Sequence, residues 1–189
     1  MIATGRLVLR EWTHSDIGAM ERVNCDPQVR LHLNSQPPDD ARTFMETAIE
    51  HWRTHGFGLF AVEDHRPGRP RRCLGFAGVS YSTFAPEHAD TPELAWRLDP
   101  ACWGHGLATE AARAARDHIF AVVGLDAVVA MIQHANVRSR RVALKLGMCE
   151  IGQTWNMLLA KPTDIWRLDI DGWRSLEAQG SAMPSVASR

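Results

Sequence analysis

Residues 103–113 read W-G-H-G-L-A-T-E-A-A-R, a turn with two glycines that leads directly into a helix start. Apolar residues then recur at helical spacing from Leu107 to Val123, which predicts the longest helix of the chain. A glycine turn of this kind presents unpaired backbone N–H groups at the positive end of the helix dipole, and such groups bind anions. The stretch therefore predicts an anion site. The segments before and after it in the sequence indicate the fold to which this site belongs.

The segments on both sides of this helix read as strands. Residues 91–98 alternate apolar and polar side chains, which is typical of a strand with one solvated face. Residues 127–132 are apolar throughout, as in a strand buried on both faces. Asn136 then suits the N-cap of a second helix, and Gly147 the left-handed position after its end. Strand, glycine turn, helix, strand and helix together predict a mixed α/β sheet.

The remaining segments extend this sheet and cover it. The pattern predicts strands at 6–9, 59–62 and 73–83, a final hairpin within 151–173, and helices after Ser15 and at 41–54. We expect one domain over residues 4–176, with no internal repeat and no linker. The small, polar composition of 177–189 predicts a disordered tail.

Composition excludes several classes of protein. The formal net charge is -1 over 189 residues, which favours neither nucleic acid nor an anionic membrane as partner. No apolar run approaches the roughly 20 residues of a membrane span, and the N-terminus lacks a signal-peptide pattern. The four cysteines form no C-x-x-C pair. His51 and His55 have the spacing of a metal pair, but no third ligand is apparent. We expect a cytoplasmic protein without a metal.

Two nucleotide-binding interpretations of the glycine turn fail. A P-loop needs a lysine after its last glycine, and none follows here. A dinucleotide site needs G-x-G-x-x-G directly after a buried strand. In this chain Thr109 occupies the third glycine position, and five residues separate the strand from Gly104.

A third interpretation rests on a family resemblance. The stretch W103-x-x-G106-x-A108 resembles the [QR]-x-x-G-x-[GA] signature of the GNAT N-acetyltransferases, with Trp103 in place of Gln or Arg. The form W-G-x-G-x-A-T-E-A is similar to that of the RimJ/RimL branch, which acetylates ribosomal-protein N-termini. E-L-A-W-R-L-D-P at 93–100 and N-V-R-S-R-R-V-A-L-K-L-G-M at 136–148 resemble two further motifs of that branch, in the same order.

The resemblance implies an acyl-CoA N-acyltransferase fold. Its sheet would be mixed and mostly antiparallel, with about seven strands, two splayed central parallel strands and about four flanking helices. It also implies acetyl-CoA as cosubstrate, with the pyrophosphate on the glycine turn and the pantetheine arm between the splayed strands. The residues expected to bind it are Trp96, Arg97, Leu98, Trp103, Gly104, His105, Gly106, Leu107, Ala108, Thr109, Asn136 and Arg141.

Acetyl transfer to an amine needs a general base and a proton donor for the leaving thiolate. Glu93 matches a glutamate that the branch often has at this point, although it would equally suit an ordinary exposed strand position. The tyrosine that many relatives use as donor corresponds to Ala143 here. By resemblance Ser139 takes that role, and its alternative role is helix capping. Carbonyl polarisation by a strand N–H would leave no signal in the sequence.

The sequence thus predicts an acetyl-CoA-dependent N-acetyltransferase that transfers an acetyl group directly to a primary amine. The acceptor would be a protein N-terminal α-amine or a small-molecule amine, and the protein a monomer or homodimer. The alternative is a non-catalytic acyl-CoA-binding or partner-binding module on the same fold.

Overall fold

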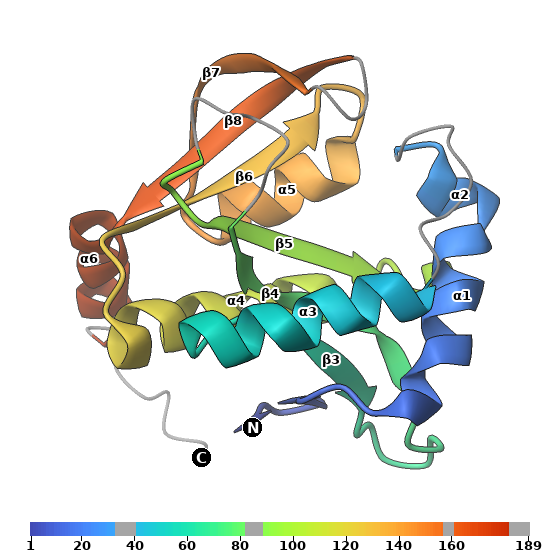
Figure 1. Cartoon of the computed structure of the whole chain (residues 1–189). Coiled ribbons are helices and arrows are strands. Elements are labelled where there is room, and N and C mark those ends of the chain that lie inside the picture. Colours follow the sequence, from blue (N-terminus) through green and yellow to red (C-terminus); the bar gives the residue numbers. More distant parts are fainter. Residues whose placement is uncertain (33–40, 82–88, 157–160, 182–189) are drawn as a thin grey trace, which may run out of the picture.

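Eight strands form one sheet in the computed structural model, which describes residues 1–32, 41–81, 89–156 and 161–181 (Figure 1). Its order is β1-β2-β3-β4-β5-β6-β8-β7, and only β5 and β6 pair in parallel. The strands are β1 (Ile2–Ala3), β2 (Leu7–Arg10), β3 (Leu59–Asp64), β4 (Cys73–Ser80), β5 (Glu93–Leu98), β6 (Ala127–Gln133), β7 (Cys149–Asn156) and β8 (Lys161–Asp169).

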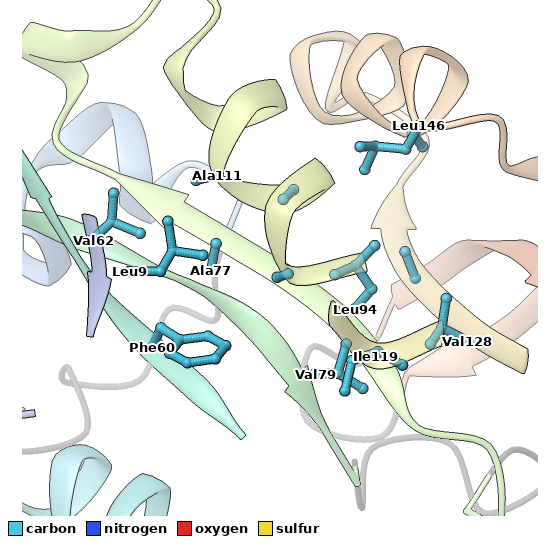
Figure 2. Close-up of a cluster of buried hydrophobic side chains, with 14 of the residues drawn as sticks. Leu9, Phe60, Val62, Ala77, Val79, Leu94, Ala111, Ile119, Val128 and Leu146 are labelled. Carbon is cyan, nitrogen blue, oxygen red and sulfur yellow. The ribbon is translucent and has the colours of Figure 1, made fainter. Parts of the chain in front are cut away.

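Helices cover both faces of this sheet. They are α1 (Ile17–Cys25), α2 (Pro27–Arg30), α3 (Ala41–His55), α4 (Leu107–His118), α5 (Val137–Lys145) and α6 (Ile170–Ser181). The larger hydrophobic cluster lies between α4 and the strands beneath it, where Ala111 and Ile119 meet Leu9, Val79 and Leu94 (Figure 2). A second cluster lies under α1 and α3 on the opposite face, around Met20, Met45 and Phe76.

The predicted mixed sheet is confirmed, whereas the one-turn helix α2 was not expected, and three further differences concern β1, the end of α4 and α6. Two-residue β1 is too short for a periodic pattern. A π-helical turn, Ile119–Val123, follows α4. Its extra residue per turn moves Val122 out of the apolar stripe in which we expected it, and that side chain is 70% exposed.

The third difference is α6, which was not expected. The helix begins directly after β8 and includes Trp173, which the sequence suggested for the hairpin, and residues 177–181, which the sequence suggested for a tail. Asp169 accepts a hydrogen bond from the Gly172 amide at 2.9 Å, as an N-terminal carboxylate does. Residues 182–189 of the predicted tail and 82–83 of the predicted strand 73–83 lie outside the described residues, and β4 ends at Ser80, one residue before Tyr81.

The two parallel strands separate almost as soon as they meet. Their register consists of one pair, Glu93 with Val129, and the Val129 amide donates to the Pro92 carbonyl at 3.0 Å. From Leu94 onward β5 has no paired residue on β6 within the described chain, and the two strands diverge in Figure 1. The predicted splay is therefore present, with its vertex at Glu93 and its wide end at the glycine turn.

Candidate active site

The glycine turn follows β5 at the wide end of the splay. Gly104 and Gly106 have φ of 81° and 76°, left-handed values that other residues adopt only under strain. The first helical hydrogen bond runs from the Glu110 amide to the Gly106 carbonyl at 3.0 Å. The amides from Gly104 to Thr109 make no hydrogen bond of good geometry with the described residues. They are the unpaired donors that an anion site requires.

An ion pair that the sequence did not reveal holds this turn in place. The Glu110 carboxylate, in the first turn of α4, accepts hydrogen bonds from the Thr4 hydroxyl at 2.6 Å and the Arg6 amide at 2.9 Å. The Arg6 guanidinium reaches the same carboxylate at 2.6 Å and the His105 carbonyl at 2.9 Å. Burial alone would raise the pKa of Glu110, but the bonds from Thr4 and Arg6 bring it below its ordinary value. The N-terminal segment thus clamps the turn.

Trp103 connects the turn to both sides of the splay. Its indole N–H donates to the Leu98 carbonyl at the end of β5, at 2.7 Å. Its ring lies under the Arg138 guanidinium of α5, 4.8 Å from the ring centroid. Where the family signature has a polar Gln or Arg, this chain therefore has a Trp whose ring packs between the turn and α5. It also occupies the Leu98 carbonyl, one of the groups that we expected on the free edge.

The N-terminus of α5, the helix that follows β6, is a second helix N-terminus at the splay. The Asn136 side chain accepts a hydrogen bond from the Ser139 amide at 3.1 Å, so Asn136 caps α5 as the sequence predicted. Ser139 does not cap the helix through its own hydroxyl, because that hydroxyl makes no hydrogen bond with a described residue. Ser139 is half-buried in the first turn of α5, whereas Arg141 is exposed.

A fully buried carboxylate, that of Asp164, holds the start of α5 in place. Asp164 of β8 accepts hydrogen bonds from His134 Nδ1 at 3.0 Å and from Gln153 Nε2 at 2.8 Å. The Arg140 guanidinium lies 3.6 Å from the same carboxylate. His134 lies two residues before the cap residue, and Arg140 follows Ser139. Asp164 therefore links residues on both sides of the first turn of α5 to the β7–β8 hairpin.

The strand residues expected at the site lie along β5. Glu93 is half-buried at the vertex, and its neighbours Trp96 and Leu98 face α4 within the larger hydrophobic cluster. Arg97 points to the opposite face, where its guanidinium reaches Asn24 of α1 at 2.8 Å and lies 5.2 Å from the Phe76 ring centroid. Because the Asp99 amide donates to the Leu74 carbonyl, the alternation of an antiparallel pair directs the Arg97 backbone groups to β4 and those of Trp96 and Leu98 to the splay edge.

A pocket of about 440 Å³ adjoins the glycine turn on the outer side of α4. It is lined by Thr4, Arg6, Gly106, Thr109, Glu110, Arg113, Ala114, Asp117 and Lys145. Three of these side chains are basic and two are acidic, and Arg6 is already paired with Glu110, which leaves Arg113 and Lys145 as the basic groups that adjoin the turn. Cys102 lies buried beside the turn, and burial together with the Asp99 charge raises the pKa of its thiol, which disfavours a reactive thiolate.

These features fit the two chemically different parts of coenzyme A. Unpaired amides and basic side chains at the turn suit its phosphates, and a strand edge without a partner suits the amides of its pantetheine arm. Among the described residues, no three His, Cys, Asp or Glu side chains gather as a metal site would require. No described helix combines the length and apolar character needed to cross a membrane. Fold and site together define a transferase that uses an acyl-CoA thioester.

The family follows from comparison with known proteins. Residues 6–149 match the acetyltransferase (GNAT) domain family. The chain is 30% identical over 149 residues to the uncharacterized N-acetyltransferase YnaD of Bacillus subtilis, an alignment that covers 78% of this chain and 81% of that protein. The chain therefore belongs to the GNAT family, and it is an N-acetyltransferase with acetyl-CoA as the acetyl donor.

Solved structures agree with this fold. An acetyltransferase from Agrobacterium tumefaciens superposes with a TM-score of 0.73 at 24% identity, over 88% of this chain and 92% of that one. The aminoglycoside acetyltransferase AAC(6')-Ib in complex with coenzyme A gives 0.71 at 14% identity, over 90% and 99%. At these identities the likeness concerns the fold alone.

Proposed function

We propose that this enzyme transfers an acetyl group directly from acetyl-CoA to a primary amine, the N-terminal α-amine of a peptide or a small-molecule amine. The observation that carries the proposal is the vertex at Glu93, a carboxylate at the point where the two parallel strands part. The RimJ/RimL-like motifs at 103–111 and 136–148 favour a peptide N-terminus as acceptor. We further propose a cytoplasmic location and a monomer or homodimer.

Residues of this chain would hold the donor at three places. The amides from Gly104 to Thr109 would bind the pyrophosphate, and Arg141 would add positive charge near α5. The Trp96 backbone and the Leu98 amide would meet the pantetheine arm, with the Asn136 amide group on its other side. Acetyl-CoA supplies the acetyl group as a thioester, whose carbonyl carbon accepts the amine.

Glu93 and Ser139 would move the two protons. The Glu93 carboxylate removes a proton from the ammonium or attacking amine, directly or through one water, so that the nitrogen lone pair can form the new N–C bond. The C–S bond breaks as that bond forms, and the thiolate is protonated through the Ser139 hydroxyl, which takes a proton from water as it gives one to the sulfur. Ser139 suits this step because its hydroxyl is not engaged with another described residue.

Thiol release in the presence of an amine panel tests this proposal. The panel contains peptide amides with a free N-terminus, amino-acid amides, a polyamine and an aminoglycoside. We expect acceptor-dependent thiol release and an acetylated amine in the product mass. Binding of acetyl-CoA in calorimetry without thiol release for any amine would favour a binding module instead.

A further inference from the structure

Two histidines near the end of α3, His51 and His55, have the spacing of a metal pair but differ in their contacts. Their ring centroids lie 4.4 Å apart, and His55 is exposed. Both ring nitrogens of His51 meet backbone groups. Nδ1 lies 2.8 Å from the Phe57 carbonyl oxygen, and Nε2 accepts a hydrogen bond from the Tyr81 amide at 3.0 Å. His51 therefore ties the segment before β3 to the end of β4, and neither of its nitrogens is left for a metal.

These two contacts determine the protonation state of the His51 ring. The Tyr81 amide can only donate, so Nε2 must accept and carries no proton. The Phe57 carbonyl can only accept, so Nδ1 must carry the proton and donate it. Only the neutral Nδ1–H form satisfies both contacts. A second proton on the ring would place an Nε2–H against the Tyr81 N–H, and that amide would lose its acceptor.

The Tyr81 amide lies next to the vertex of the splay. Tyr81 follows Ser80, the last residue of β4, and Ser80 pairs in register with Glu93. The Asp99 amide donates to the Leu74 carbonyl, so these two residues form a hydrogen-bonded pair. Such pairs alternate along an antiparallel ladder, and the alternation makes Ser80 and Glu93 exchange backbone hydrogen bonds as well. The end of β4 therefore supports the backbone of the proposed base.

Titratable groups meet the imidazole of His51 from two elements. His55 meets it on α3, and the Tyr81 ring meets it from the end of β4, with the centroids 6.0 Å apart. The Phe57 ring, which is apolar, packs edge-on at 5.3 Å. The charged neighbours along α3, Glu50 and Arg53, pair with each other at 2.7 Å. Protonated His55 would therefore repel a positive charge on the neighbouring imidazole.

The neutral form of His51 prevails at neutral pH. Burial lowers the pKa of His51, the bond to the Phe57 carbonyl raises it, and the charge of His55 lowers it again, with a net result below its ordinary value. The contribution of this group to stability is thus present above the unfolded-state pKa of about 6.5 and is lost as pH falls through the folded-state pKa.

We propose that His51 is a positioning residue of the active site, which in its neutral form holds the end of β4 and with it the Glu93 backbone at the vertex. Because both of its nitrogens are engaged, His51 acts through the Tyr81 amide and the Ser80–Glu93 pair. When the ring takes a proton, this support is lost and the Glu93 carboxylate is held less well. The inference rests on the proposed role of Glu93 and adds a pH-sensitive element outside the proton transfers.

Kinetics of three variants test this role: His51→Leu, His51→Gln and His55→Leu. Thiol release is measured with the best amine of the panel at saturating acetyl-CoA, between about pH 5 and pH 9. His51→Leu should lower kcat about fivefold near pH 8, the effect of one ordinary hydrogen bond, with the Kd of acetyl-CoA unchanged. His51→Gln should keep the wild-type kcat there, because its side-chain oxygen can accept from the Tyr81 amide.

The pH dependence separates positioning from mere packing. The acceptor amine and Glu93 titrate in every variant, so the ratio of a variant's rate to that of the wild type isolates the proton on His51. Long-range ¹⁵N spectra of the wild-type ring give its tautomer and its pKa without turnover. We expect a protonated Nδ1 and a pKa below about 6.5. The ratio for His51→Gln should rise as pH falls through that pKa, because glutamine does not titrate.

His55→Leu is the matched control, since it removes an exposed histidine one helical turn away. Its kcat should stay within about twofold of the wild type.

Four results would overturn the inference. They are a ring with its proton on Nε2, a wild-type kcat in folded His51→Leu, a flat ratio for His51→Gln through the pKa of the ring, and a loss in His55→Leu as large as that in His51→Leu. If His51→Leu does not fold, the ring spectra and His51→Gln decide. A wild type that binds acetyl-CoA but releases no thiol with any amine refutes the proposed function instead.

Discussion

The anion site at the glycine turn gives the sharpest test, because the chain contains its own control. Gly106 begins α4 with φ of 76°, and Gly124 follows the helical segment at its far end with φ of 78°. A Cβ at Gly106 would lie 3.6 Å from Arg6 Nη2, an ordinary contact, and one at Gly124 would meet nothing within 4 Å. Gly106→Val and Gly124→Val therefore both force an L residue into a left-handed φ, and at neither position does the Cβ meet a close contact.

The two variants should share a loss of stability and differ in affinity. A left-handed L residue costs roughly 1 to 2 kcal/mol, so each melting temperature should fall by about 2 to 8 °C. Only at Gly106 does the new side chain stand among the amides from Gly104 to Thr109. Losing one hydrogen bond to a charged phosphate costs about 1.5 to 3 kcal/mol. The Kd of coenzyme A should then rise tenfold or more for Gly106→Val.

Isothermal calorimetry with coenzyme A on both folded variants makes the measurement. His105→Ala provides a further comparison, since only the backbone of His105 is assigned to the site, and its affinity should stay close to that of the wild type. An unchanged Kd for folded Gly106→Val would refute the anion site. An equal loss for Gly124→Val would assign the effect to strain in α4 and refute the argument in the same way.

Three other substitutions test the remaining groups. Glu93→Gln should lower kcat by about 10² at neutral pH and less at high pH, where free amine is abundant, with acetyl-CoA affinity unchanged; a wild-type rate would assign the base to water. Ser139→Ala should lower turnover by ~10² at unchanged affinity, and Ser139→Cys should keep part of the activity; normal turnover of the alanine variant would leave Ser139 without a catalytic role. Asp16→Asn should lower the free energy of unfolding by about 3 kcal/mol at pH 7, because buried Asp16 meets Arg10 at 2.8 Å. Burial raises the pKa of Asp16, but Arg10 and Thr13 together bring it below its ordinary value, so its contribution is present above pH ~4 and lost as pH falls through the folded-state pKa. Urea unfolding should therefore show a smaller difference at pH 3 than at pH 7, and an equal difference would contradict this origin.

Local patterns were enough for the elements that form the site. The glycine pair, the helix after it and the Asn136 cap each depend on a few adjacent residues, and all three are present as predicted. No sequence pattern predicted the splay of the two strands. That expectation came from the family resemblance. The vertex of the splay needed the register of Glu93 with Val129, two residues 36 positions apart in the sequence.

The residues that the sequence did not reveal act over long separations. Arg6 and Glu110 are 104 positions apart, and neither stands out locally, because an arginine just before a strand and a glutamate in a first helical turn are both common. α6 was hidden because the I-D-G-W stretch is short of helix formers, and packing of Trp173 on Phe120 and its bond to Asp117 supplies what propensity lacks.

Paired polar groups hold the unpaired ones of the splay in position. Glu110 meets Arg6 beside the glycine turn, and Asp164 meets His134 beside the start of α5. Between these pairs, the amides of the turn and the Ser139 hydroxyl have no partner among the described residues. Unpaired groups raise the free energy of the native state, and a bound ligand would complete their hydrogen bonds. The positioning of unpaired groups by paired neighbours is the arrangement that a binding site requires.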